Sequence, residues 1–196
     1  PTARAPSIAV LPFADMSAEK NQEYFSDGLA EELLNKLAKI QGLRVAARTS
    51  SFHFKGKNED LRTIAEKLNV ATILEGSVRR EGKRVRITVQ LINASDGFHL
   101  WSQTYDREMD DIFQAQDEIA RSVAASLKVL LQGDRTGAAS LRSTNPEAYN
   151  AYLQGRFFLA REPRSPDNYL KAVDHFEQAV KLDPAYALGW AWLGES

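Results

Sequence analysis

The sequence contains no cysteine, has almost no net charge and lacks any long apolar run. Without cysteine there are no disulfide bonds, thiolate metal sites or cysteine nucleophile, and either cytoplasm or periplasm is compatible. With 26 acidic residues against 25 lysines and arginines, the formal charge is −1, so no overall field attracts nucleic acid or an anionic membrane. No apolar run approaches the roughly 20 residues of a membrane span, and no signal-peptide pattern is present.

The apolar residues that are present fall into strand and helix periods. Residues 7–13 form a short continuous apolar run, which predicts a strand buried on both faces. Leu29, Leu33 and Leu37 recur every four residues and predict a helix, with Asp27 as its N-cap. Further elements are expected as follows: a strand over 43–47, a loop over 50–57, a short helix over 60–68, strands over 71–79, 84–93 and 98–105, and a helix over 111–131.

The three later strands predict an antiparallel meander, with Gly82 in the first turn and the alternating residues Val85 to Leu91 half buried. The order βαβα, then the meander and a closing helix, predicts an α/β (α+β) domain with a mixed β-sheet and covering helices in residues 1–132. Residues 133–144 are small and polar and predict a linker. Residues 145–196 predict an all-α helical hairpin.

This hairpin resembles the start of a tetratricopeptide-repeat array. Trp190, Leu193 and Gly194 match the opening of one repeat, and Ala172 and Phe176 match the second helix of the repeat before it. Gly155 stands where two helices must cross closely. Because one repeat cannot bury its own apolar face, we expect the array to continue beyond Ser196 and the chain to be part of a longer protein.

Counting repeat positions from Gly155 identifies the side chains expected on the exposed concave face, where such repeats bind a peptide or partner helix. These candidate protein-binding residues are Tyr149, Tyr152, Arg156 and Leu159.

Seven segments of the α/β region, in unbroken order, resemble the TolB amino-terminal-like domain, also called FlgO-like. They are Ser7–Phe13, Gln22–Leu29, Ala47–Phe52, Leu74–Arg79, Val85–Leu91, His99–Trp101 and Asp111–Ile119. The resemblance implies a regulatory or interaction module of bacterial proteins, followed by tetratricopeptide repeats. It further implies that a class III nucleotidyl cyclase domain, a CadC-type winged-helix domain or a kinase domain precedes it. The resemblance supplies no catalytic residue.

Three further patterns of charged or metal-binding residue types bear on catalysis and ligand binding. A basic hairpin, comprising Arg79, Arg80, Lys83, Arg84 and Arg86, fits a solvated sheet face better than a nucleic-acid surface. The carboxylates Asp15, Asp27, Glu31 and Glu32 form a possible cluster at the sheet edge, although helix capping explains the last three more simply. The three histidines lack metal-ligand spacing. We therefore expect no catalytic, cofactor or metal site.

Three functional hypotheses follow. The first is a non-enzymatic sensing and protein-interaction segment of a bacterial signalling protein. The second is the C-terminal regulatory region of a class III adenylate or guanylate cyclase, whose activity resides elsewhere in the parent protein. The third is a small-molecule-binding α/β domain. The location would be cytoplasmic beside a cyclase domain and periplasmic behind a membrane span.

Overall fold

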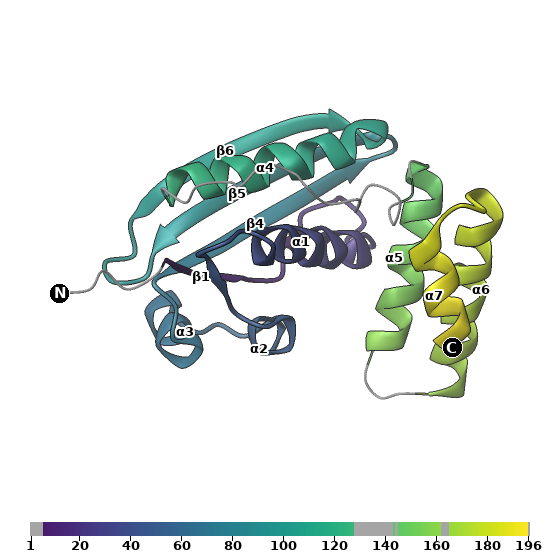
Figure 1. The fold of residues 1–196 in the computed structure, drawn as a ribbon, viewed down its shortest axis with the longest axis horizontal. Coiled ribbons are helices and arrows are strands. Elements are labelled where there is room, and N and C mark those ends of the chain that lie inside the picture. The colour runs from purple at the N-terminus through teal and green to yellow at the C-terminus, as the bar shows by residue number, and fades with distance from the viewer. Residues whose placement is uncertain (1–5, 128–142, 144, 162–164, 196) are drawn as a thin grey trace. The chain divides into compact units, whose positions relative to one another are not determined.

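The computed structural model describes residues 6–127, 143, 145–161 and 165–195, and the chain divides into two compact units (Figure 1). The first unit covers Pro1–Gly133 and the second covers Asp134–Ser196. The predicted linker lies outside the described residues except for Ser143. The expected fold class, a mixed α/β domain followed by a helical segment, is confirmed.

The first unit is built on one mixed sheet with the strand order β3-β1-β4-β5-β6. Strand β1 (Ser7–Val10) is fully buried and runs parallel to both β3 (Arg44–Val45) and β4 (Thr72–Glu81). Strands β4, β5 (Arg84–Asn93) and β6 (His99–Glu108) form the expected antiparallel meander. The short β2 (Ala14–Asp15) pairs with β4 beyond the end of β1.

Alternating side chains give the two faces of this sheet different coverings. Helices α1 (Glu23–Ala38) and α4 (Ile112–Ser126) lie side by side on one face (Figure 1). This face carries Leu74 and Val78 of β4 and Val85, Ile87, Val89 and Leu91 of β5. Ile112, Ala115, Ile119 and Val123 of α4 are buried, whereas residues 128–131 of the expected helix lie outside the described part. A 3-10 turn, η1 (Met109–Asp111), leads into α4.

On the opposite face, the covering that the described residues provide lies near the start of β4. Helix α3 (Leu61–Leu68) packs Ile64 and Ala65 against Ile73, Leu11 and Phe54. The expected short helix over 60–68 is confirmed. The Asp60 carboxylate accepts the N–H of Arg62, and Asn69 ends the helix in the left-handed region at φ 51°.

Two predictions for the region between β1 and α3 are wrong. Asp27 does not cap α1, because that helix begins at Glu23 and the buried Phe25 lies in its first turn. Residues 50–57 are not simply a loop, because α2 (Arg48–Phe52) occupies the beginning of this segment. The backbone before α1 is fixed by Asp15, whose carboxylate accepts the N–H groups of Ser17 and Gln22.

The second unit consists of α5 (Pro146–Ala160), α6 (Pro166–Leu182) and α7 (Ala187–Glu195). Asn145 and Ser165 cap the first two helices, each followed by proline at the first helical position. Asn145 also donates from Nδ2 to the carbonyl of Leu182 at 3.1 Å, which ties the start of α5 to the end of α6. The close crossing expected at Gly155 is confirmed, since a Cβ there would lie 2.5 Å from the Phe176 ring.

Candidate interaction surfaces

Beyond the area that α3 covers, the second face of the sheet is polar. Four rows of side chains cross β4, β5 and β6, because paired residues point to the same face. The rows are Glu75–Gln90–Ser102, Ser77–Thr88–Thr104, Arg79–Arg86–Asp106 and Glu81–Arg84–Glu108. We call this surface the open face. It carries no aromatic side chain in these rows, and it holds hydroxyl, amide and charged groups suited to polar recognition.

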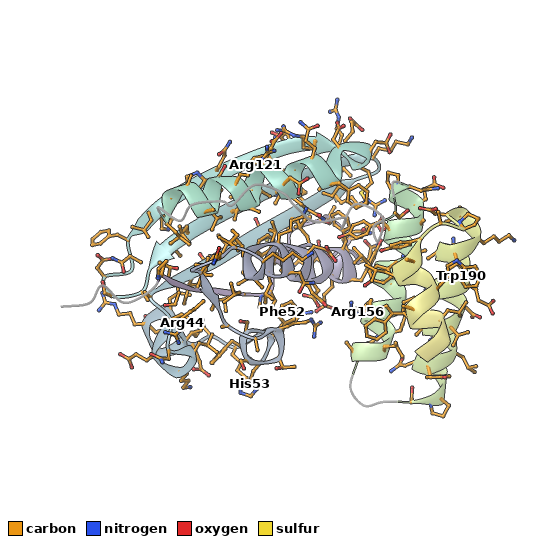
Figure 2. The ribbon with its side chains drawn as sticks, viewed as in Figure 1. Arg44, Phe52, His53, Arg121, Arg156 and Trp190 are labelled. Carbon is orange, nitrogen blue, oxygen red and sulfur yellow. The ribbon has the colours of Figure 1, made fainter. Side chains whose placement is uncertain are left out.

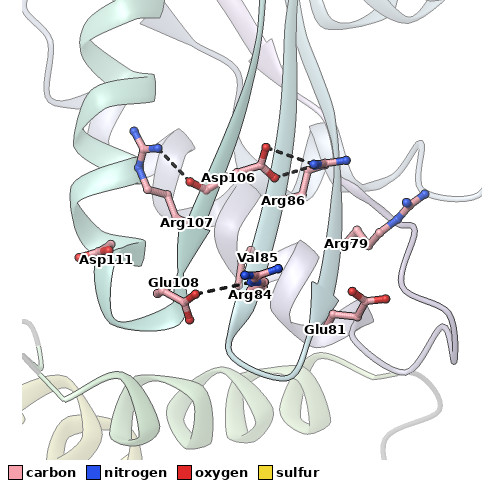
Figure 3. Close-up of a pocket in the computed structure, with 9 residues that line it drawn as sticks. All are labelled: Arg79, Glu81, Arg84, Val85, Arg86, Asp106, Arg107, Glu108 and Asp111. Carbon is pink, nitrogen blue, oxygen red and sulfur yellow. Dashed lines mark hydrogen bonds and ion pairs between the residues drawn. The ribbon is translucent and has the colours of Figure 1, made fainter.

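A partly open hollow of about 650 Å³ lies at the charged end of the open face and extends past it to Val85, Arg107 and Asp111 (Figure 3). The Arg86 guanidinium binds the Asp106 carboxylate through two hydrogen bonds of 2.6 and 3.2 Å, which holds the pKa of Asp106 below its ordinary value. Arg107 donates to the Asp106 carbonyl and to Glu118 of α4. A smaller hollow of about 330 Å³ lies between the β1–β2 connection and the middle of the same face.

The basic hairpin seen in the sequence is therefore not a uniformly positive surface. Arg84 faces Glu108 at 3.8 Å, and Arg86 is paired with Asp106. Arg79 donates to the carbonyl of Met16, while Arg80 donates to Gln22 and Tyr24 near the start of α1. Carboxylates neutralise Arg84 and Arg86, which agrees with the interpretation as a solvated sheet face. Arg80 is an exception, because it pairs with Val85 on the helix-covered face.

A second polar region joins α1 to α2, and we call it the α1–α2 seam. Glu23, Asp27 and Glu31 lie at four-residue spacing on α1, so they share one face of the helix. Lys55 forms ion pairs with Glu23 and Asp27, and Arg48 donates to Glu31 at 2.7 Å. The capping explanation of Asp27, Glu31 and Glu32 is wrong, because α1 begins at Glu23 and all three lie beyond its N-cap. Asp27 and Glu31 instead bind cations of the following segment.

The α1–α2 seam also contains two buried oxygens without a hydrogen-bond partner, Asp27 Oδ1 and Ser51 Oγ. Sequence reasoning missed Arg48, Ser51 and Lys55, although their spacing of three and four residues is typical of one helical face. Burial raises the pKa of Asp27, and Lys55 opposes that effect only in part. The charged form of the Asp27 carboxylate is therefore destabilised in the α1–α2 seam, because burial removes part of its hydration.

We expect Asp27→Asn to stabilise the first unit at neutral pH. Because the folded pKa of Asp27 lies above its unfolded value, this carboxyl favours folding less as pH rises from the unfolded value through the folded one. The gain from Asp27→Asn should therefore grow from pH 4 to pH 8, as measured by urea unfolding across that range. Glu23→Gln is the matched control, since Glu23 pairs with the same lysine but is 52% exposed. A gain independent of pH would contradict the electrostatic cause.

In the second unit, the prediction that Tyr149 and Tyr152 are exposed is wrong. Their exposed fractions are 3% and 2%. The Tyr152 ring lies between Phe176 and Tyr186, at centroid distances of 6.2 and 5.2 Å, so it belongs to the core of these helices. Changing Tyr152 should therefore weaken the fold, so this residue is not an exposed binding residue.

The other two candidates, Arg156 and Leu159, are half-buried. Arg156 donates to the Tyr152 hydroxyl at 2.9 Å, and its guanidinium lies 4.3 Å from the Trp192 ring centroid. Trp190 on α7 is 52% exposed and donates from its indole nitrogen to the carbonyl of Pro184 (Figure 2). Arg156 thus joins α5 to α7, and its binding role stays a prediction.

The three consecutive aromatic residues Phe52, His53 and Phe54 differ in their surroundings. Phe54 is buried in the α3 cluster, whereas Phe52 lies under the Arg48 guanidinium at 4.3 Å and His53 is exposed (Figure 2).

Across the described residues, no group of three or more His, Cys, Asp or Glu side chains is placed to hold a metal ion. In the same part of the chain, no helix combines the length and apolar character needed to cross a membrane.

Together these elements define a mixed α/β domain with a polar open face, followed by a helical unit. The family described as "HilA/YgeH-like transcriptional regulator, second domain" matches residues 3–122, more than half of the chain, and the chain belongs to that family. A protein named putative adenylate cyclase 3 from Rhizobium meliloti (strain 1021) is 45% identical over 189 residues. That match covers 96% of this chain and 32% of the relative, so the chain spans about a third of the relative's length.

Solved structures similar to the chain are more distant. TolB from Acinetobacter baumannii has 14% identity and a TM-score of 0.47, covering 64% of this chain and 29% of that chain. The LpoB C-terminal domain from Escherichia coli has 15% identity and a TM-score of 0.42, covering 55% of this chain and 87% of that chain. These scores are too low to carry a conclusion about function. The comparisons indicate a signalling or regulatory role through the family and the relative.

Proposed function

We propose that this chain is a non-enzymatic regulatory segment of a bacterial nucleotidyl cyclase. The observation that carries the proposal is the 45% identity to a putative adenylate cyclase, which extends over 96% of this chain and so over both units. About two thirds of that relative lies outside the match, which leaves room for a separate catalytic region. The open face presents polar side chains in rows and no metal-binding group of carboxylates among the described residues.

The test compares the parent protein with and without the segment equivalent to residues 6–195. Cyclic-nucleotide formation from ATP and from GTP is measured for the parent, for the deletion variant and for this chain alone. The expected result is no turnover by this chain, activity in the parent, and a changed basal rate in the deletion variant. Turnover by this chain above the buffer blank would overturn the non-enzymatic assignment. An inactive parent that folds correctly would overturn the link to a cyclase.

The proposal gives the helical unit a protein-binding role as the beginning of a tetratricopeptide-repeat array. The small-to-large contact between Gly155 and Phe176 supports this interpretation, since it allows α5 and α6 to cross closely. Arg156 and Leu159 are the predicted binding residues that keep part of their side chains accessible. Once a partner is identified, Leu159→Ala is expected to lower its affinity, and an unchanged dissociation constant would remove the idea.

A second candidate function is small-molecule binding at the open face. The two hollows of about 650 and 330 Å³ support it, and the charged side chains that line the larger one would suit a charged or hydroxylated ligand. A thermal-shift screen with nucleotides, sugars and short peptides tests this function. A ligand that raises the melting temperature of the chain but not of an Arg86→Ala variant supports the open face as its site. The absence of any shift would remove this candidate.

A further inference from the structure

The outer edge of β6 is the feature from which we draw a new inference. Strand β6 ends the strand order and is bonded on one side only, to β5, within the described part of the chain. It is ten residues long and contains no proline, and most of its side chains are exposed. Free N–H and C=O groups along such an edge are a template for pairing with another strand.

The alternation of bonded and non-bonded residue pairs in the meander shows which backbone N–H and C=O groups of β6 point away from β5. The two-residue turn Gly82–Lys83 makes Glu81 and Arg84 the closing bonded pair, and bonded pairs then alternate along the ladder. Odd-numbered residues of β6 therefore bond to β5, and the 2.7 Å bond from the Met109 N–H to the Lys83 carbonyl fits this alternation. The backbone groups of Ser102, Thr104 and Asp106 consequently point away from the sheet.

We propose that β6 pairs antiparallel with β6 of a second copy of this chain, with Thr104 on the two-fold axis. In this register the outward groups of Ser102 meet those of Asp106 in the other copy, and Thr104 meets Thr104. The outward N–H and C=O groups of β6 in each chain then bond to those of the other chain, and the two sheets become continuous. The irregularity opposite Leu91 and Ile92 limits the regular pairing to residues after Leu100.

The charges of β6 favour a second copy as the occupant. On the open face, Asp106 of one copy lies opposite Ser102 of the other, and the axis passes through uncharged threonines. On the helix-covered face, Arg107 lies opposite Trp101, a pairing that permits a cation–π contact. No like charges are placed directly opposite each other in this register. The paired edge is short, so we expect a dimer that dissociates on dilution.

Sedimentation velocity of the 196-residue chain over a wide concentration range tests the proposal. Wild type should change from monomer to dimer as concentration rises. Thr104→Pro should remain monomeric with an unchanged circular dichroism spectrum, because the N–H it removes is not bonded to β5. Thr104→Lys should also remain monomeric, whereas Thr88→Lys, on the same face of the inner strand, should still dimerise.

The absence of cysteine allows a direct test of the register. Thr104→Cys should form a disulfide-linked dimer on mild oxidation, since bonded antiparallel partners lie within disulfide range, roughly 5.5 Å between Cα atoms. Thr88→Cys should not cross-link. A chain that stays monomeric at every concentration, with Thr104→Cys also monomeric, would overturn the proposal and leave the edge to a different partner. A dimer that tolerates Thr104→Pro would place the interface elsewhere and overturn it as well.

Discussion

Phe176→Ala is expected to destabilise the helical unit by about 3–5 kcal/mol, the usual cost of removing a buried phenylalanine. The Phe176 ring is completely buried and lies against Gly155, Tyr152 and Trp192. Its loss leaves a cavity between all three helices, because the close crossing of α5 and α6 was shaped around that ring. Hydrogen exchange followed by mass spectrometry should show faster exchange in peptides of 146–195.

Two controls separate this effect from a general loss of stability. Leu170→Ala, on the same helix, removes a side chain that is 62% exposed and should leave exchange unchanged. Peptides of β4 and β5 should exchange at the wild-type rate in both variants, provided that the two units unfold independently. Wild-type exchange of α5 and α6 in Phe176→Ala would show that the aromatic cluster does not hold these helices together.

Gly76→Ala is expected to destabilise the first unit by about 1–3 kcal/mol, the range for overpacking a core. Gly76 lies on the helix-covered face of β4, where a Cβ would lie 2.6 Å from the backbone oxygen of Thr88 and 3.0 Å from the Phe13 ring. A backbone oxygen in the neighbouring strand cannot move without disturbing the ladder. Urea unfolding followed by circular dichroism should show a lower midpoint with an unchanged slope.

The contact that limits Gly76 can be identified by a second substitution. Phe13→Leu in the Gly76→Ala background removes ring atoms from the contact but leaves the Thr88 oxygen in place. We expect little recovery of stability in this double variant. Ser77→Ala, one residue further on the open face, is the control and should have a small effect. Full recovery by Phe13→Leu would assign the strain to the ring instead of the backbone.

Much of the sheet could be predicted from local patterns. The alternation in 84–93 identifies β5 and its buried face, since side chains of a strand alternate strictly between two faces. Asp60 and Asn69 similarly mark both ends of α3, because each acts on the backbone beside it. Such signals depend on residues close in sequence, and these predictions are confirmed.

The misassigned positions depend on contacts between distant residues. The start of α1 is set by Asp15, which bonds to the N–H of Gln22 from the other end of a loop. Asp27 and Glu31 were noticed as a possible cluster, but their cations, Lys55 and Arg48, lie on the next segment of the chain. Local patterns could not show that pairing.

The helical unit gave a different error. Counting repeat positions correctly located the close approach at Gly155 but assigned Tyr152 to an exposed surface. The tyrosine instead completes an aromatic core with Phe176 and Tyr186, because α7 closes over α6. The sequence indicates the opening of a further repeat at Trp190, but counting positions from Gly155 takes no account of the residues against which α7 packs.

The position of β1 has a consequence for the order of events when the chain is synthesised. This strand lies between β3 and β4, and its bridge partners on the β4 side begin at Thr72. A ribosome therefore releases the apolar segment Ser7–Val10 long before its main neighbour exists, whereas β4, β5 and β6 can pair as soon as each hairpin emerges. Strand β1, which lies inside the sheet, is among the first parts made, but its pairing with β4 has to wait until Thr72 and the residues after it have been synthesised.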